Sequence, residues 1–224
     1  AMPEESVERE LLMEMANHLK QALRHDPDDP RMNLRFSAAC LRRFELEQRH
    51  ATNPMALQQI REAALASQFA SKKDQDAWLD VAVGENKKLL DLALAHCQRA
   101  LRAGPLQGDG YVYLADLSFL EGSNVDAKNA YVNQAYRVRP HNGVVAFAMG
   151  QERALVGDLE GALKRWREAF HQDPKIQSLI IEQFSVSIPG KSFLEYFQPD
   201  IGALHVLQRN YQRNGLNADA QEVA

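Results

Sequence analysis

Three residues near the C-terminus, Gly190-Lys191-Ser192, resemble the end of a phosphate-binding loop. Such a loop needs another glycine five residues before the Gly-Lys pair, so that its backbone can wrap the phosphates. Ser185 stands at that position, and Pro189 lacks an N–H where the loop would need a donor. The sequence therefore predicts a turn here rather than a nucleotide site.

The other reactive side chains do not form a catalytic or metal-binding pattern. His96 and Cys97 are adjacent on a predicted helix, so their side chains point about 100° apart. The chain contains no His-Glu-x-x-His, Cys-x-x-Cys or Gly-x-Ser-x-Gly spacing. Its two cysteines, Cys40 and Cys97, fall within helical patterns and are expected to be buried free thiols. We expect a protein that is not an enzyme and has no catalytic residues, metal ligands or cofactors.

Composition and charge exclude two classes of partner. The 224 residues are 45% hydrophobic and 25% charged, with a net charge of −4. Residues 1–105 hold 15 basic and 16 acidic groups, and residues 106–224 hold 11 and 14, so neither part is basic enough to favour nucleic acid. No apolar run approaches the roughly 18 residues that cross a bilayer. We expect no nucleic-acid binding and no membrane insertion by this chain.

Helical periodicity runs through almost the whole chain. Residues 5–24 predict one helix with a single apolar stripe, made by Val7, Leu11, Leu12, Met15, Leu19 and Leu23. Asp29 and Pro30 provide a cap and first turn for the next helix, which should reach His50. The further helices are expected at 54–71, 74–83, 86–103, 109–121, 125–138, 143–156, 159–172, 175–186 and 199–213. The tail after Leu216 is expected to fray.

A repeated pattern of small residues and prolines organises these helices. Pro140 lies 34 residues before Pro174, and Pro105 lies 35 residues before Pro140. An alanine lies five residues before each of these prolines. The three alanines are Ala100, Ala135 and Ala169. A period of about 34 residues indicates stacked helical hairpins.

These residues resemble a tetratricopeptide repeat array. The best match is 142–174, carried by Gly150, Gly157, Ala162, Trp166, Ala169 and Pro174. The resemblance implies an all-α fold, a right-handed superhelical array of antiparallel helical hairpins. We expect irregular hairpins over residues 1–104, two well-matched repeats and a following helix over 105–186, and capping helices with a tail over 187–224.

The same resemblance implies a concave groove lined by the first helix of each hairpin. On this alignment Val112, Asp116 and Phe119 of one repeat, with Phe147 and Gln151 of the next, face the groove and bind a partner. Phe119 and Phe147 are alternatively plain core between repeats. The family's clamp for a terminal carboxylate uses a Lys and an Asn at slots that this chain fills with other residues. An apolar groove with an acidic edge favours an extended or helical peptide.

Two interpretations of the C-terminal region stay open. Phe193, Tyr196 and Phe197, at spacings of three and four, either cap the apolar end of the array or form an exposed docking patch. The stretch from Pro105 to Asp200 is similar to the repeat tails of bacterial membrane proteins of the O-antigen ligase/polymerase type.

The leading function is a non-catalytic protein–protein interaction scaffold that binds a protein or peptide. The alternative is a regulatory or positioning tail of a membrane glycan-assembly protein of that ligase/polymerase type. A complete chain would be cytoplasmic, and a piece of a longer membrane protein would be membrane-attached. The sequence leaves the oligomeric state open, although an uncapped end of such an array can pair two chains.

Overall fold

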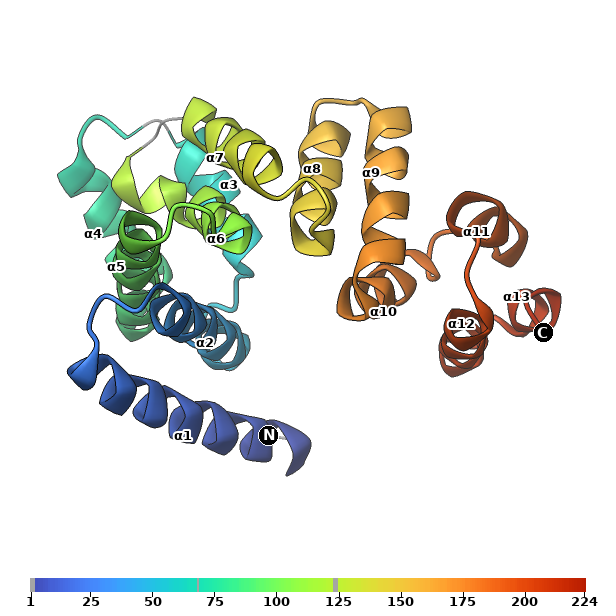
Figure 1. Cartoon of the computed structure of the whole chain (residues 1–224), viewed down its shortest axis with the longest axis horizontal. Coiled ribbons are helices and arrows are strands. Elements are labelled where there is room, and N and C mark those ends of the chain that lie inside the picture. The colour runs from blue at the N-terminus through green and yellow to red at the C-terminus, as the bar shows by residue number, and fades with distance from the viewer. Residues whose placement is uncertain (1–2, 68, 123–124) are drawn as a thin grey trace. The chain divides into compact units, whose positions relative to one another are not determined.

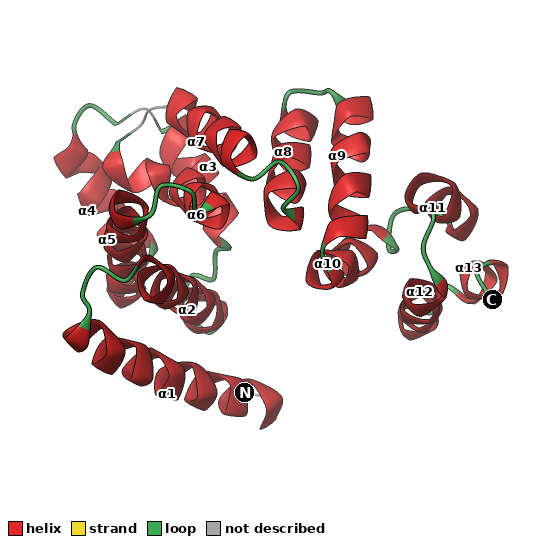
Figure 2. Cartoon of the chain, in the orientation of Figure 1, coloured by secondary structure: helices red, strands yellow, loops and turns green. Residues whose placement is uncertain are grey.

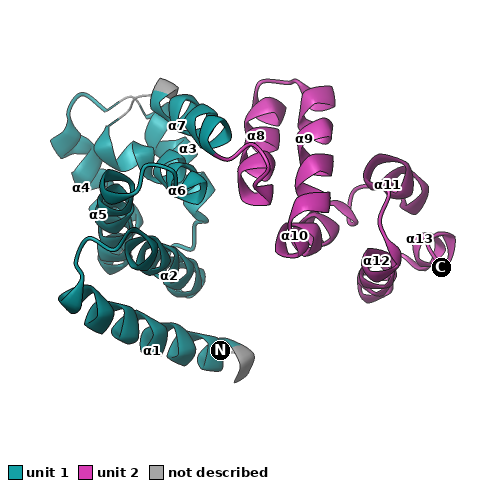
Figure 3. Ribbon diagram, in the orientation of Figure 1, with its two compact units in different colours: residues 1–138 teal, residues 139–224 magenta. Residues whose placement is uncertain are grey.

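The computed structural model describes residues 3–67, 69–122 and 125–224. Every regular element in these residues is helical and none is a strand, which confirms the all-α class (Figure 2). The chain divides into two compact units, residues 1–138 and 139–224 (Figure 3). The sequence had suggested boundaries near 105 and 187. The difference arises because helices on both sides of each expected boundary pack together, as described below.

The first unit contains seven α-helices and two short 3-10 turns within its described residues. They are α1 (Pro3–His25), α2 (Pro30–Arg49), α3 (Leu57–Ala66), α4 (Lys72–Ala82), η1 (Gly84–Asn86), α5 (Lys87–Ala103), α6 (Gly108–Leu117), η2 (Ser118–Glu121) and α7 (Val125–Val138) (Figure 1).

The predicted break between the first two helices is confirmed. Asp29 caps α2 by accepting a hydrogen bond from the Met32 N–H at 2.7 Å, and Pro30 occupies the first helical position. Capping by aspartate satisfies a backbone N–H that has no partner within the helix. The helices α1 and α2 therefore form a hairpin with a four-residue turn, residues 26–29.

The main partner of α5 is α2, and not the preceding helix α4, with which a hairpin of neighbouring helices would have paired it. Ser37 on α2 donates from Oγ to the Ala93 carbonyl on α5 at 2.8 Å. Asn86 at the start of α5 donates to Gln48 at the end of α2, at 3.0 Å. The two helices are therefore antiparallel, and residues 50–86 form an insertion between them. Helices that are neighbours in the sequence therefore do not pair here, because α2 contacts α5 across the insertion.

The insertion also has different helix boundaries from those expected. Thr52-Asn53-Pro54 does not open a helix, since the Asn53 carbonyl accepts a hydrogen bond from Gln48 and α3 begins only at Leu57. Ser71 does not end that helix. Its Oγ accepts from the Asp74 N–H at 3.2 Å and so caps α4. The polar residues of both segments can either cap a helix or form a turn, and contacts with distant parts of the chain decide between the two.

Close packing continues from α5 to α6 across the boundary expected at residue 105. Cys97 on α5 donates from Sγ to the Gly110 carbonyl on α6 at 3.0 Å. A Cβ on Gly110 would lie 3.0 Å from the Leu101 side chain, so glycine sets the separation of the two helices. These contacts place α5, α6 and α7 in one unit.

The second unit begins with the hairpin that best matches the repeat pattern. Its helices are α8 (Gly143–Leu155), α9 (Leu159–Gln172), α10 (Pro174–Phe184), α11 (Gly190–Phe197), α12 (Ile201–Arg213) and α13 (Asn217–Glu222). Figure 1 shows α8 and α9 side by side and antiparallel. Gly157, with a φ of +83°, follows α8 and lies in the turn before α9. Pro174 is the first residue of α10, one position earlier than the helix expected at 175–186.

Small residues let α8 and α9 approach closely. Ala162 and Ala169 are fully buried, and a Cβ on Gly150 would lie only 2.4 Å from the Trp166 indole. The indole also contacts the ring of Phe184 on α10, with the centroids 4.7 Å apart and the planes tilted by 54°. Gly150 and Trp166 therefore pack directly against each other, and the missing side chain of Gly150 makes room for the indole.

The C-terminal residues complete the core of this unit rather than fray. Phe193 and Phe197 of α11 are fully buried against Phe170 of α9, which favours the capping interpretation of the aromatic cluster, while Tyr196 is 47% exposed. Beyond Leu216 the chain forms α13, whose Ala220 and following Val223 are buried. The expected fraying is wrong because this short helix covers the apolar end of the unit.

Gly150→Ala should destabilise the second unit by about 1–3 kcal/mol, because the new methyl group cannot fit against the Trp166 indole. Gly202→Ala is the matched control, since a Cβ there meets nothing closer than 3.4 Å and alanine favours helix. Denaturant unfolding followed by Trp166 fluorescence in a Trp78→Phe background measures both. Equal stability of the two variants would contradict the close-packing account.

Candidate functional site

The residues predicted to line a concave groove are divided between the two units. In the first unit, Phe119 is fully buried in the core and Val112 is 7% exposed. Phe119 therefore agrees with the alternative that it is core, and Val112, expected in the groove, is buried as well. Asp116 is accessible, but its Oδ1 accepts a hydrogen bond from Arg61 Nη1 at 2.7 Å.

Arg61 belongs to the insertion, and α3 covers the face of α6 that carries Asp116. Ile60 and Ala64 of α3 are fully buried in the core of the first unit. Gln75 of α4 donates to the Phe119 carbonyl, which fixes α4 beside the same segment. The repeat pattern gave no signal of this arrangement, because a periodic alignment treats residues 50–86 as further hairpins.

In the second unit, Phe147 is 8% exposed and belongs to the core, whereas Gln151 is exposed on α8. Among the five residues, Asp116 and Gln151 thus keep accessible polar groups. Their role in partner binding stays a prediction.

The phosphate-loop resemblance at Gly190 has a structural explanation. The backbone N–H of Gly190 donates to Asp219 Oδ1 at 2.7 Å, and that of Lys191 donates to Glu222 Oε2 at 3.0 Å. Two carboxylates of α13 thus occupy the N-terminus of α11, where the helix dipole attracts anions. A Cβ on Gly190 would approach the Asp219 carbonyl to 3.1 Å, so glycine permits this contact. The predicted turn is wrong at these positions, because Gly190, Lys191 and Ser192 form the start of α11 and the turn lies before them, at residues 185–187. The chain's own acids close this helix N-terminus.

Replacing both acids, Asp219→Ala with Glu222→Ala, should lower the stability of the second unit by about 1–2 kcal/mol, because two N–H groups lose their caps. The control is Glu182→Ala, an exposed glutamate on α10. Urea unfolding read by Trp166 fluorescence in the Trp78→Phe background compares them. A double variant as stable as the control would show that α13 is not fastened by these caps.

The remaining reactive groups are inaccessible or scattered. Cys40 and Cys97 are buried free thiols, as predicted, and burial raises the pKa of Cys40 to about 11 and that of Cys97 to about 12. Within the described ranges, no group of three or more His, Cys, Asp or Glu residues could hold a metal ion. In the same residues, no helix has the length and apolar character needed to cross a bilayer.

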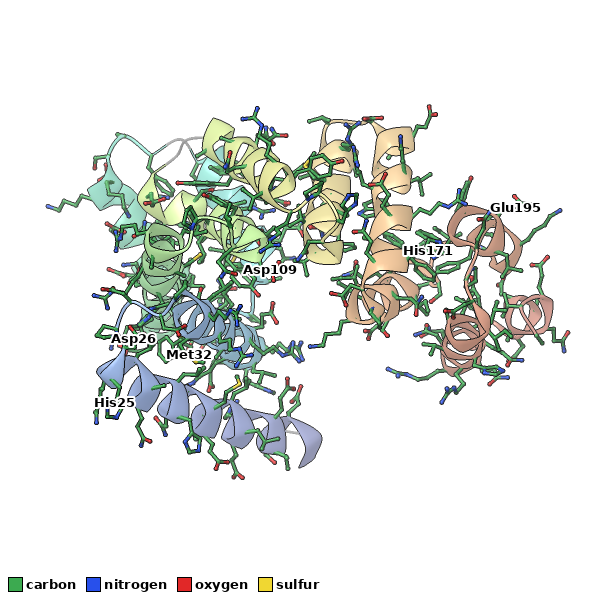
Figure 4. All side chains as sticks on the ribbon, viewed as in Figure 1. His25, Asp26, Met32, Asp109, His171 and Glu195 are labelled. Carbon is green, nitrogen blue, oxygen red and sulfur yellow. The ribbon has the colours of Figure 1, made fainter. Side chains whose placement is uncertain are left out.

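A groove lies between α1 and α2 in the first unit. It comprises two adjoining depressions of about 450 and 480 Å³ that share Met15 and Leu19. The floor is apolar and comes from both helices, with Leu11, Leu12, Met15, Leu19 and Ala22 on α1 and Met32, Ala38 and Ala39 on α2. Figure 4 labels Met32 near the turn that carries His25 and Asp26. We call this feature the α1–α2 groove.

The groove exists because the apolar stripe predicted for α1 is really two stripes. Leu19 and Leu23 are buried against the rest of the unit. Val7, Leu11 and Met15, spaced four residues apart, lie on a neighbouring face and are 54%, 60% and 43% exposed. Large apolar side chains gathered on one exposed face mark an interaction surface more often than scattered ones do.

Ion pairs hold the N-terminal half of α1 against α2. Glu8 accepts from both Nε and Nη2 of Arg42 at 2.7 Å, and Arg9 lies 3.3 Å from Glu47. Pairs that are this exposed each contribute roughly 0–1 kcal/mol. This half of α1 is therefore fastened by charge rather than by burial, and its apolar face stays available.

A buried asparagine fixes the turn that sets the two walls of the groove. Asn33 is fully buried and donates from Nδ2 to the carbonyls of Pro27 and Asp29, each at 2.8 Å. Its Oδ1 lies 2.7 Å from Nδ1 of His96 on α5. Because the amide donates to two carbonyls, Oδ1 must be the acceptor, so His96 carries its proton on Nδ1. One side chain thus joins the α1–α2 turn to α5.

His96 is held in its neutral form. Burial lowers the pKa of His96 below its ordinary value of 6.5, and the charges of Arg99 and Lys20 act in the same direction. The ring also packs on Phe36, with centroids 4.4 Å apart. Unfolded chains bind a proton at His96 more readily than folded ones. The neutral His96 side chain therefore contributes fully to the stability of the folded chain above pH 6.5. This contribution is lost as the pH falls through the lowered pKa of His96 in the folded chain.

His96→Gln should flatten the pH dependence of stability of the first unit. Glutamine can donate to Asn33 but does not titrate, so the wild-type chain should lose more stability than the variant between about pH 7 and pH 5. Urea unfolding followed by Trp78 fluorescence in a Trp166→Phe background measures this, with the exposed His25→Gln as control. Parallel pH profiles for His96→Gln and the wild type would refute the buried neutral histidine.

The groove offers binding chemistry: an apolar floor, with Arg35 exposed on its α2 side and Glu14 and His18 on its α1 side. Such a surface can receive an apolar stripe flanked by charged groups.

The chain matches no protein-family model and no curated protein sequence. The functional proposals therefore rest on geometry and chemistry.

Proposed function

We propose that this chain is a non-catalytic protein–protein interaction module and that the α1–α2 groove receives an amphipathic helix. The observation that carries the proposal is the exposed apolar stripe of Val7, Leu11 and Met15 beside the groove floor. The finer fold assignment, a right-handed tetratricopeptide-like array, belongs to the same proposal. It is supported by the antiparallel α8–α9 hairpin, where Gly150, Trp166 and the buried Ala162 and Ala169 of the repeat match lie at the helix contact.

The shape and chemistry of the groove favour a helix over an extended strand. The floor runs along α1 from Leu11 to Ala22, which at 1.5 Å per residue is about 16 Å, or three helical turns. Both walls are helices, whose backbone groups are already hydrogen-bonded, so an extended peptide would find no main-chain partners there. A helix satisfies its own backbone and needs only apolar contact from the floor.

Selection of displayed helical peptides against the chain tests this function. We expect amphipathic helices to be enriched, and Leu11→Glu with Met15→Glu to weaken them at least tenfold. Burying two carboxylates on the apolar floor costs more than the ~1.4 kcal/mol that a tenfold change represents. Val81→Glu is the control, since Val81 is 85% exposed in the same unit but does not line the groove.

Two results would contradict the groove assignment. Peptides that bind the wild type and the Leu11/Met15 variant equally would place the site elsewhere. If those peptides were instead lost with Gln151→Ala, the exposed polar face of α8 would be the site. Asp116 is unsuitable for such a variant because its removal would leave the buried Arg61 without this ion pair.

A further inference from the structure

We infer that the helix received by the α1–α2 groove is α1 of a second copy of this chain, packed antiparallel in a two-fold symmetric dimer. The inference rests on the proposed function and names its partner. It is carried by the charge distribution of α1 together with the exposed apolar stripe on the same helix.

The two halves of α1 carry opposite charge. Between residues 5 and 14 there are four acidic residues, Glu5, Glu8, Glu10 and Glu14, and one basic residue, Arg9. Between residues 15 and 25 there is no acidic residue, and the charged groups are Lys20 and Arg24, with His18 and His25 alongside. The polarity suits the dipole of α1 itself, and it also makes the helix complementary to an antiparallel copy of itself.

The wall contributed by α2 strengthens the basic end of the groove. The first turns of α2 carry Arg31 and Arg35 and no acidic residue, and Met32 between them lines the groove near Ala22. These residues add to the basic end of the groove. At the other end, Arg42 of α2 lines the groove and pairs with Glu8, so the acidic charge there comes from α1 alone. An antiparallel α1 from a second chain brings its acidic half to the basic end. A parallel copy would place like charges together, which is unfavourable at an interface.

The apolar stripe matches the same arrangement. With the two-fold axis near Met15, the rise of 1.5 Å per residue sets Leu11 beside Leu19 of the other chain and Val7 beside Ala22, and both of these partners line the groove. All of these positions are apolar. The contact is isologous, so it closes on itself and yields a dimer rather than a filament.

Other occupants fit less well. An anionic lipid surface is disfavoured, because α1 from Pro3 to His25 holds five acidic and three basic residues and so is net negative. A uniformly acidic or basic helix would match only one end of the groove. The second copy satisfies both ends and supplies the apolar stripe.

Sedimentation equilibrium of the full chain tests the dimer. Over about 1–100 µM, a range suited to an interface of this modest size, the mass should rise from 25.3 kDa toward twice that value. Leu11→Glu with Met15→Glu should shift the midpoint at least tenfold to higher concentration, while Val81→Glu should leave it unchanged. Circular dichroism confirms that each variant is folded. A wild type that stays monomeric throughout would overturn the inference.

A cross-linking experiment tests the antiparallel orientation. Chains with Val7→Cys and chains with Ala22→Cys, when mixed, should join through a short bis-maleimide, and neither should join to itself. The native thiols are buried and will not compete. Self-linking of the Val7→Cys chain would show a parallel pairing and overturn the proposed arrangement. An unchanged midpoint in the Leu11/Met15 variant would show that the dimer forms elsewhere.

The two proposals fail in different ways. A monomeric chain whose groove binds selected peptides, and loses them with the Leu11/Met15 variant, would overturn the dimer and support the interaction module. A monomeric chain that binds no helical peptide would overturn both.

Discussion

The first unit depends on the hydrogen bonds of one buried side chain. Asn33 has both amide protons and its carbonyl oxygen engaged, by Pro27, Asp29 and His96. A buried amide without partners would cost about 1–3 kcal/mol for each unmet group, so turn, α2 and α5 are held in one arrangement. The turn sets where α1 lies beside α2, and hence the width of the groove. A polar group in the core thus determines the shape of an apolar surface.

The two units reach stability by different routes. In the second unit, neighbours in sequence pack together, and small residues such as Gly150 and Ala162 decide how closely they approach. In the first unit, α2 and α5 pair across an insertion, which is fastened by Arg61 to Asp116 and by Gln75 to the Phe119 carbonyl. These two polar contacts join segments more than forty residues apart and orient helices that lack strong local signals.

Part of the apolar surface of α1 is left uncovered by the rest of the first unit. Its C-terminal half is buried through Leu19 and Leu23, whereas its N-terminal half is fastened mainly by exposed ion pairs such as Glu8 with Arg42. Exposed pairs contribute little energy, so burying Val7, Leu11 and Met15 against another helix would add stability that the isolated unit lacks. Both proposals, the interaction module and the dimer, rest on this difference between the buried and the exposed half of α1.

The sequence by itself determined the all-α class, most helix boundaries, the buried cysteines and the helical hairpin at 143–172. These features depend on local periodicity, caps and residue size, which neighbours in sequence specify. Only the tertiary structure decided that α5 pairs with α2, that Asp116 binds Arg61, and that Asp219 and Glu222 cap α11. It also divided the stripe of α1 into a buried and an exposed face, because a helical pattern shows which residues are apolar but not which neighbour covers them. Those contacts join residues far apart in the chain, and spacing alone carries no information about them.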